Sequence, residues 1–315
     1  MVFSYTDCMN FEVFVLGTSG MMPLPNRYLT SAMVRRDGEL FLFDCGEGTQ
    51  VSLKMLNLKW KKIHSIFISH MHADHVTGLP GILMLSSQVD RNEPLTIYGP
   101  ARLKEYIDAN RRILDMYINY EIVVKVAESG VILETDDFTI SAFPLHHTKP
   151  CVGYVMQEKD RPGEFHPEQA QQLGVPMGPM WGKLQKGLSI TLGDGTIIES
   201  HQVIGPKREG RKFSYVTDSV YLPSIAEHVK KSDLLLCEGM FTADMAETAY
   251  EKKHMTADQA ARIAKEAEVA QLGLLHYSPR YSDRELKYLL KDAKKVFGPT
   301  ILTKDRMCFD IPLKD

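Results

Sequence analysis

The sequence predicts a layered α/β protein with a site at one edge of a sheet. Apolar, β-branched runs typical of buried strands alternate with helix-like segments in both halves of the 315-residue chain. Polar side chains suited to chemistry follow five of these strands, at His70–His75, His147, Asp218, Glu238 and His276. In open α/β sheets, functional groups gather where the strands end. We therefore expect these five positions to meet.

The first half of the chain supplies most of the predicted strands. Strands are predicted over residues 12–16, 32–36, 40–43, 63–68, 95–98, 121–126, 131–133, 138–143 and 152–157, with helices over 50–58, from about 78, and over 101–116. Gly17 and Gly20 permit a tight turn after the first strand. Asp37-Gly38 is a strong hairpin signal, and Asp136-Asp137 marks a further turn.

The second half opens with a break in the pattern. Between about residues 158 and 212, repeated Gly and Pro predict an insertion with little regular core in what is otherwise a single domain spanning residues 1–315. Strands then resume over 213–216, 233–237, 272–275, 300–302 and 307–311, with helices over 226–231, 257–267 and 283–296. Thr256 is a plausible cap for the second of these helices.

The composition indicates a globular protein without a membrane span. Hydrophobic residues make up 44% and charged residues 24% of the chain, and no apolar run reaches the ~18 residues that a span needs. The first eleven residues include Asp7 and lack a basic, apolar leader. Five widely spaced cysteines (Cys8, Cys45, Cys151, Cys237 and Cys308) favour free thiols in a reducing cytoplasm. A net charge of −3 gives no general attraction to nucleic acid.

A dense group of metal-binding residues follows the strand over 63–68. His70, His72, Asp74 and His75 lie within six residues. Imidazole nitrogens beside a carboxylate suit zinc or manganese. One ion has room for only some of these groups, so the spacing indicates two metals. His147, Asp218 and His276 are the further candidates, and Asp218 suits a bridging role because a carboxylate has two oxygens.

The remaining histidines are weaker candidates for metal binding. His64 lies inside a predicted strand, where we expect a core or hydrogen-bonded residue. His166, His201 and His228 fall in predicted loops or on a helix and should be solvated. Strand alternation turns only one of His146 and His147 inward.

Four motifs stand out in the chain: the HxHxDH pattern from His70 to His75, Phe43–Gln50, Val76–Gly81 and His276–Tyr281. Together they resemble the metallo-β-lactamase superfamily and, within it, the ribonuclease Z family. The resemblance runs from about Phe14 to Phe309. It implies an αββα sandwich, with two mixed sheets flanked by helices and a protruding arm.

The resemblance also implies residue roles. His70, His72 and His147 would bind one zinc, Asp74, His75 and His276 the other, and Asp218 would bridge the two ions. Asp74 would also accept a proton from the attacking water, while Glu238 and His254 would serve the leaving oxygen.

The insertion over about 158–207 resembles the arm with which this family grips tRNA. The expected RNA-binding residues are Gly178, Pro179, Trp181, Lys183 and Lys186 on the arm and Arg280 near the metals. We expect Trp181 to offer an aromatic face and the lysines to contact phosphates. The resemblance implies precursor tRNA as substrate and a homodimer.

The sequence thus predicts a zinc-dependent endoribonuclease that removes the 3′ trailer of precursor tRNA and leaves a tRNA 3′-hydroxyl. One alternative is a hydrolase of the same fold acting on small phosphodiesters or other esters, which would share every metal residue and differ in the arm. Another is a non-catalytic RNA-binding relative, which should have lost metal ligands. All seven are present here.

Overall fold

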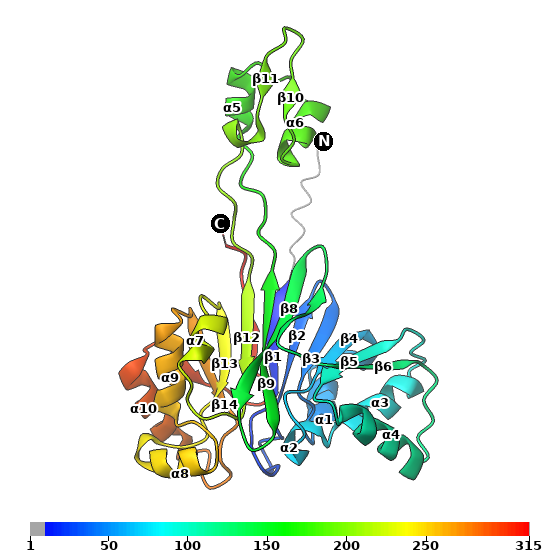
Figure 1. The fold of residues 1–315 in the computed structure, drawn as a ribbon, viewed down its shortest axis with the longest axis vertical. Helices are drawn as coiled ribbons and strands as arrows, with labels where there is room; N and C mark the ends of the chain where they lie inside the picture. Colours follow the sequence, from blue (N-terminus) through cyan, green and yellow to red (C-terminus); the bar gives the residue numbers. More distant parts are fainter. Residues whose placement is uncertain (1–9, 315) are drawn as a thin grey trace. The chain divides into compact units, whose positions relative to one another are not determined.

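Two seven-stranded β-sheets pack face to face in the computed structural model, which describes residues 10–314 (Figure 1). The first sheet has the order β16-β1-β2-β3-β4-β5-β6, and the second has the order β15-β14-β13-β12-β9-β8-β7. Their strands are β1 (Phe11–Gly17), β2 (Ser31–Arg36), β3 (Glu39–Phe43), β4 (Ile63–Phe67), β5 (Leu95–Gly99), β6 (Ile122–Val126), β7 (Gly130–Glu134), β8 (Phe138–His146), β9 (Pro150–Glu158), β12 (Lys212–Val216), β13 (Leu234–Glu238), β14 (Gln271–Leu275), β15 (Thr300–Leu302) and β16 (Cys308–Asp310).

Helices cover the outer face of each sheet (Figure 1). On the first sheet these are α1 (Thr49–Met55), α2 (Ala73–Val76), α3 (Leu79–Gln88) and α4 (Leu103–Ile113). On the second they are α7 (Ser224–His228), α9 (Ala257–Glu266) and α10 (Leu286–Val296), whereas α8 (Ala246–Glu251) buries Ala249 against Met240 and Phe241 in a cluster of its own. Each helical layer packs on its sheet through a separate buried apolar cluster. The predicted αββα sandwich with two mixed sheets is confirmed.

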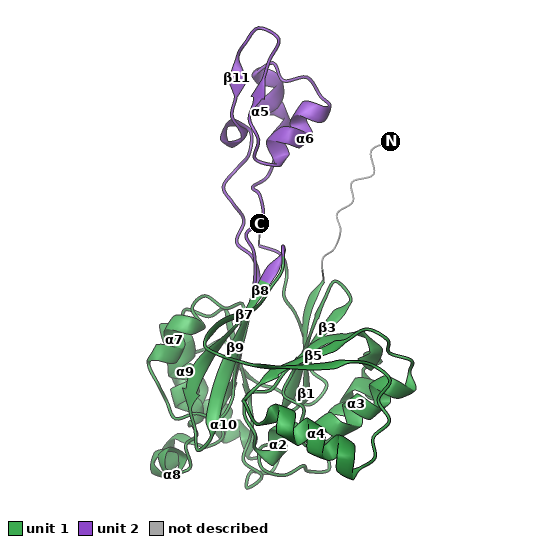
Figure 2. Cartoon of the chain, turned by 45° about the vertical axis from the view of Figure 1, so that its right-hand side comes forward, with its two compact units in different colours: residues 1–135, 139–156, 212–312 green, residues 136–138, 157–211, 313–315 purple. Residues whose placement is uncertain are grey.

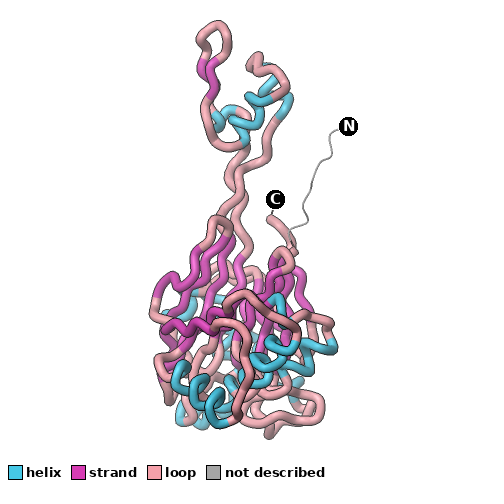
Figure 3. The backbone as a smooth tube through the Cα atoms, turned by 90° about the vertical axis from the view of Figure 1, so that its right-hand side faces the viewer, coloured by secondary structure: helices cyan, strands magenta, loops and turns pink. Residues whose placement is uncertain are grey.

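An aromatic layer joins the two sheets. The ring of Phe43 on β3 lies 5.9 Å from Tyr154 on β9, 5.4 Å from Phe213 and 5.7 Å from Tyr215 on β12, measured between centroids. Phe67 on β4 stacks on Phe43 at 5.0 Å. Such distances are favourable for aromatic pairs. The layer therefore fixes strands of one sheet against strands of the other. Figure 3, coloured by secondary structure, shows how the strands gather in the middle of the larger unit.

Most predicted elements are confirmed, with differences at their ends. The helices predicted over 50–58 and 101–116 end at Met55 and Ile113, because Asn57 (φ 55°) and Asp115 (φ 47°) adopt the left-handed conformation that stops a helix. The helix predicted over 283–296 starts at Leu286. Thr256 caps α9 in a capping box, as expected. Helix α8 has no counterpart among the predicted elements.

The described residues divide into two compact units (Figure 2). The larger contains residues 10–135, 139–156 and 212–312, and the smaller contains 136–138, 157–211 and 313–314. The predicted insertion over 158–207 falls inside the smaller unit. Whether the chain behaves as a single domain stays a prediction.

The expectation that the insertion has little regular core is wrong. It contains α5 (Pro167–Gln172), α6 (Pro179–Gln185), β10 (Ile190–Thr191) and β11 (Ile197–Ile198). These elements surround an apolar cluster made of Ala170, Val175, Leu184, Ile190, Ile198 and Val203, each at most 6% exposed.

The proline and glycine residues of the insertion delimit short elements and do not prevent them. Pro167 and Pro179 occupy first helical positions, where proline is favoured. Gly174 (φ 76°) and Gly187 (φ 80°) follow the two helices in the left-handed conformation typical of helix ends. The residues that interrupt the periodicity of the sequence are therefore the same ones that begin and end its helices.

No helix among residues 10–314 is both long and apolar enough to cross a membrane. Cys45, Cys151 and Cys237 are buried free thiols, and Cys308 is an exposed one. Cys8, and most of the segment in which no leader is expected, lie outside the described residues.

Leu184→Ala should destabilise the smaller unit by about 3 kcal/mol, because it removes a fully buried side chain from a small cluster. Backbone amides over residues 165–204 should then exchange with solvent faster in hydrogen-exchange mass spectrometry, and those of the larger unit should not. Met177→Ala, at a side chain 76% exposed, is the matched control. Equal exchange in both variants would contradict a structural role for the cluster.

Candidate metal centre

Both sheets bring polar residues to the carboxyl ends of parallel strands. In the first sheet β3 and β4 are parallel, and Asp44 and His70 follow them. In the second sheet β12, β13 and β14 are parallel. Asp218 follows β12, Glu238 ends β13 and His276 follows β14. The predicted convergence at one edge is confirmed, and it involves both sheets.

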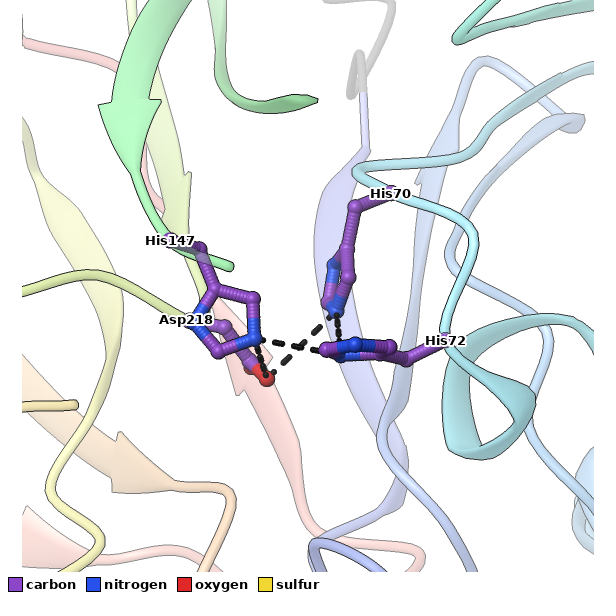
Figure 4. A group of neighbouring side chains, drawn as sticks. All are labelled: His70, His72, His147 and Asp218. Atoms are coloured by element: carbon purple, nitrogen blue, oxygen red, sulfur yellow. Dashed lines mark hydrogen bonds and ion pairs between the residues drawn. The ribbon is translucent and has the colours of Figure 1, made fainter. Parts of the chain in front are cut away.

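Three histidines and one oxygen of Asp218 form the first group of potential ligands (Figure 4). His72 Nδ1 lies 3.0 Å from His70 Nε2 and 3.1 Å from His147 Nε2. Both Nε2 atoms lie 3.5 Å from Asp218 Oδ2. Because burial lowers the pKa values of His72 and His147 to about 4, both imidazoles are neutral at pH 7 and keep a lone pair for a metal.

Asp74, His75 and His276 form the second group, which faces the other oxygen of Asp218. His75 Nε2 lies 3.3 Å and His276 Nε2 3.1 Å from Asp218 Oδ1. Asp74 Oδ2 lies 3.8 Å from His75 Nε2 and 3.9 Å from His276 Nε2. The two oxygens of one buried carboxylate thus point at two separate sets of donors.

Three buried polar atoms of the second group lie close together but form no hydrogen bond. His75 Nε2, His276 Nε2 and Asp218 Oδ1 are all buried, and none forms a hydrogen bond with any group of residues 10–314. An unpaired buried polar atom costs about 1–3 kcal/mol, and three of them meet here. A divalent cation at this point would satisfy all three, so the residues fit a metal.

The ring nitrogens that face away from this centre are held by the scaffold. His276 Nδ1 lies 2.8 Å from Thr30 Oγ1, and His147 Nδ1 lies 2.8 Å from the carbonyl oxygen of Lys253. Such outer contacts fix the tautomer and orientation of metal-binding histidines. His276 itself adopts a left-handed backbone (φ 59°), which accompanies its turn out of β14.

Asp44 is the main outer partner of this centre. Its carboxylate is fully buried and accepts hydrogen bonds from Ser69 N at 2.7 Å, Ser69 Oγ at 2.8 Å and the Tyr215 hydroxyl at 3.0 Å. It also lies 2.7 Å from His75 Nδ1. Asp44 therefore orients His75 and fixes the start of the His70 loop. Sequence reasoning missed this role, although the position of Asp44 directly after a buried strand was a usable signal.

Close backbone packing explains the glycines around this loop. A Cβ on Gly46 would lie 2.5 Å from the carbonyl oxygen of Asp74, and one on Gly20 would lie 2.8 Å from His276 Nε2. A side chain at Gly20 or Gly46 would collide with these atoms, so only glycine fits at the two positions. Met21 N, just after Gly20, donates to Asp74 Oδ2 at 2.7 Å.

Glu238 and His254 form a buried pair beside the first group. His254 Nδ1 lies 3.1 Å from Glu238 Oε2, and Ser219 N donates to Glu238 Oε1 at 2.6 Å. Burial lowers the pKa of His254, but the Glu238 carboxylate and then Asp218 outweigh burial and raise it to about 9. His254 is therefore a buried, readily protonated imidazole and not a residue on the surface.

The histidines judged to be weaker candidates belong to neither ligand group. His64 Nδ1 lies 2.9 Å from Ser65 Oγ, so this residue is hydrogen-bonded as expected. His201 and His228 are exposed, and the ring of His228 stacks on Phe143 at 4.5 Å. His166 is half-buried in the smaller unit.

The predicted RNA-binding residues are divided between the two units. Gly178, Pro179, Lys183 and Lys186 are exposed in the smaller unit. Arg280 is exposed in the larger unit, with its guanidinium 5.0 Å from the centroid of Phe241. The RNA-binding role of these five residues stays a prediction.

The expectation that Trp181 offers an aromatic face to RNA stays a prediction. Trp181 is half-buried in the smaller unit, 5.2 Å from the ring of Phe165, and donates its indole N–H to the Val175 carbonyl oxygen at 3.2 Å. Its ring packs against the apolar cluster of the arm. Part of the aromatic side chain is therefore used in the packing of the smaller unit.

Family models and known protein sequences match this chain over most of its length. The model of the anti-Pycsar protein Apyc1 matches residues 11–159, and the model of the beta-lactamase superfamily domain matches residues 201–277. Ribonuclease Z of Treponema denticola is 60% identical over 308 residues, covering 98% of this chain and 100% of the relative. Ribonuclease Z of Borreliella burgdorferi is 43% identical, covering 95% of this chain and 96% of the relative.

Solved structures share the fold. The crystal structure of human tRNase Z, short form, is 26% identical with a TM-score of 0.69, covering 96% of this chain and 100% of that one. The metallo-beta-lactamase fold protein YhfI of Bacillus subtilis is 22% identical with a TM-score of 0.66, covering 96% of this chain and 100% of that one.

The fold and its histidine- and aspartate-lined centre define a metal-dependent hydrolase with the metallo-β-lactamase architecture. Similarity over nearly the whole chain to the two ribonuclease Z relatives identifies the family within this class of hydrolases. The chain belongs to the ribonuclease Z family.

Asp44→Asn should weaken metal binding by about 10–100-fold, since the amide cannot accept from all four partners of the carboxylate. The measurement is metal content per chain and zinc affinity by competition with a chromogenic chelator. Asp108→Asn, which removes an exposed carboxylate paired with Lys104, should leave both unchanged. Equal zinc affinity in the two variants would exclude the orienting role of Asp44.

Proposed function

We propose that this protein is a zinc-dependent endoribonuclease that removes the 3′ trailer from precursor tRNA and leaves a tRNA 3′-hydroxyl. Membership of the ribonuclease Z family supports the substrate and reaction. The observation that carries the chemistry is the Asp218 carboxylate, whose two oxygens face two separate groups of ligands.

His70, His72 and His147 would hold one ion, Asp74, His75 and His276 would hold the other, and Asp218 would contact both. Nitrogen and carboxylate donors in this proportion suit zinc, with manganese as the alternative. Two such ions would supply a water activated as nucleophile and positive charge that stabilises the phosphoryl oxygens in the transition state.

The chain's own groups would move the protons. Asp74, whose carboxylate faces both second-group histidines, is placed to accept the proton of the attacking water. His254, held through Nδ1 by Glu238, would use its other ring nitrogen to donate to the leaving oxygen. Glu238 would act as the positioning residue of this pair.

Binding of the RNA would involve both units. Exposed Lys183 and Lys186 suit phosphate contacts, as do the backbone groups of Gly178 and Pro179, and Arg280 would contact a phosphate near the metals. The exposed part of Trp181 would offer an aromatic face to the RNA, while the rest of its ring packs against the apolar cluster of the arm.

We also propose a homodimer and a cytoplasmic location. The dimer rests on the resemblance to the ribonuclease Z family. The location is supported by the tRNA-processing role and by four cysteines that remain free thiols in the described part of the chain.

The decisive experiment is cleavage of a precursor tRNA with a 3′ trailer. Wild-type protein with zinc or manganese should release the trailer and leave a 3′-hydroxyl, and chelation should abolish this activity. Asp74→Asn should reduce kcat by about 10³-fold or more with little change in substrate affinity, because it removes both a ligand of one ion and the group that would accept the proton of the attacking water. A folded, zinc-loaded wild-type protein that leaves the tRNA intact would disprove the proposal.

Loss of the arm lysines should affect RNA and small substrates differently. Lys183→Gln with Lys186→Gln should raise KM for precursor tRNA by about tenfold, because two phosphate contacts are lost. Hydrolysis of a small chromogenic phosphodiester should not change. The control Lys291→Gln with Lys294→Gln removes the same charge from exposed positions on α10. If both double variants bind tRNA equally well, the arm lysines are not part of the RNA-binding surface.

A further inference from the structure

The five histidines of the two ligand groups differ in how their outward ring nitrogens are held. Four of these nitrogens have a buried or half-buried partner within 3.0 Å: Ser69 Oγ for His70, Asp44 Oδ2 for His75, the carbonyl oxygen of Lys253 for His147, and Thr30 Oγ1 for His276. Within residues 10–314, His72 is the exception, because its Nε2 lies 3.3 Å from Oγ1 of the exposed Thr148. The outer contact of His72 is therefore the longest of the five and the one most open to solvent.

The chemistry of the imidazole ring sets the direction of this hydrogen bond. His72 Nδ1 faces the first group of ligands, 3.0 Å from His70 Nε2 and 3.1 Å from His147 Nε2. A nitrogen that binds a metal offers its lone pair, so the other nitrogen of a neutral ring carries the proton. His72 Nε2 then donates to the hydroxyl oxygen of Thr148. This contact favours the tautomer in which Nδ1 is free for a metal.

The strand end that carries Thr148 is itself held in place. The backbone N–H of His146, at the end of β8, donates to Ser219 Oγ at 3.1 Å. Val220 N donates to the carbonyl oxygen of His146 at 3.0 Å. Ser219 and Val220 directly follow Asp218 in the chain. The turn with Thr148 is therefore fixed to the segment that bears the shared carboxylate.

The contact between His72 and Thr148 also joins the two sheets. His72 lies in the loop after β4 of the first sheet, and Thr148 lies in the turn after β8 of the second. Figure 4 shows the rings of His72 and His147 facing each other from these two segments. Because His72 is half-buried, packing restricts its ring less than it restricts the ring of the buried His70. The Thr148 hydroxyl adds a constraint that packing alone does not supply.

We propose that Thr148 is a positioning residue of the metal centre, which holds the His72 ring so that Nδ1 points at the ion of the first group. The inference rests on the metal-binding part of the proposed function and deepens it. Thr148 acts through His72 and is not itself a metal ligand. Loss of its hydroxyl should therefore loosen one of the two ions and leave the other, held by the second group, unchanged.

The test compares Thr148→Val, which removes the hydroxyl but keeps the branched shape, with Thr148→Ser, which keeps the hydroxyl. Zinc-loaded proteins are dialysed against increasing concentrations of a chelator, and the zinc that remains per chain is measured. Thr148→Val should lose one ion at an about tenfold lower chelator concentration than wild type and retain the other as wild type does. Thr148→Ser should match wild type, as should the control Thr191→Val at an exposed threonine of the smaller unit.

A second measurement observes the His72 ring directly. In the metal-free protein, nitrogen-15 NMR of the imidazoles should show His72 protonated mainly at Nε2 in wild type and in Thr148→Ser. In Thr148→Val, a larger share should be protonated at Nδ1, since the acceptor for Nε2–H is lost. The melting temperature should not change, because the substituted side chain is exposed. A lower melting temperature with an unchanged tautomer would show a merely structural role and contradict the proposal.

Cleavage of precursor tRNA provides a third measurement and separates this inference from the proposed function. Thr148→Val should need about tenfold more zinc than wild type for half-maximal cleavage, and Thr148→Ser should not. Equal zinc retention by wild type and Thr148→Val, or loss of both ions together, would overturn the role of Thr148 alone. A wild-type protein that holds two ions but leaves the tRNA intact would contradict only the proposed function, and one that holds no zinc would contradict both.

Discussion

The arrangement of the candidate metal centre depends on one buried carboxylate, whose two oxygens face different groups of histidines. Asp218 is 2% exposed, and four histidines lie 3.1–3.5 Å from one of its oxygens or the other. Burial favours the protonated form of the carboxyl, yet His276, His75 and His70 hold its pKa well below the ordinary value. The side chain therefore stays charged where a cation can be shared.

Both sheets hold Asp218 and the surrounding histidines in place. The His70 loop follows β4 of the first sheet, whereas Asp218 and His276 follow β12 and β14 of the second. The aromatic layer around Phe43 joins the sheets, and the Tyr215 hydroxyl, which comes from the second sheet, donates to Asp44 in the first. Rigid packing of this kind is what keeps ligands preorganised for a metal.

The smaller unit is built from short elements around an apolar cluster of its own. Its elements are short, and proline or glycine residues mark the start and end of its two helices. Its few buried side chains, including Leu184, form a cluster separate from the sheets. Such a unit can present exposed lysines to a ligand without disturbing the strand ends that hold the metal ligands.

The sequence by itself determined the strand order along the chain, the ligand types and their places at strand ends, because periodicity and residue chemistry are local properties. Only the tertiary structure decided which oxygen of Asp218 faces which histidines, that Asp44 and Thr30 orient two of them, and that Trp181 packs partly against the apolar cluster of the arm. These facts depend on the direction of side chains from segments far apart in the chain. No local pattern encodes such directions, since they are set by how the two sheets and the arm cluster pack.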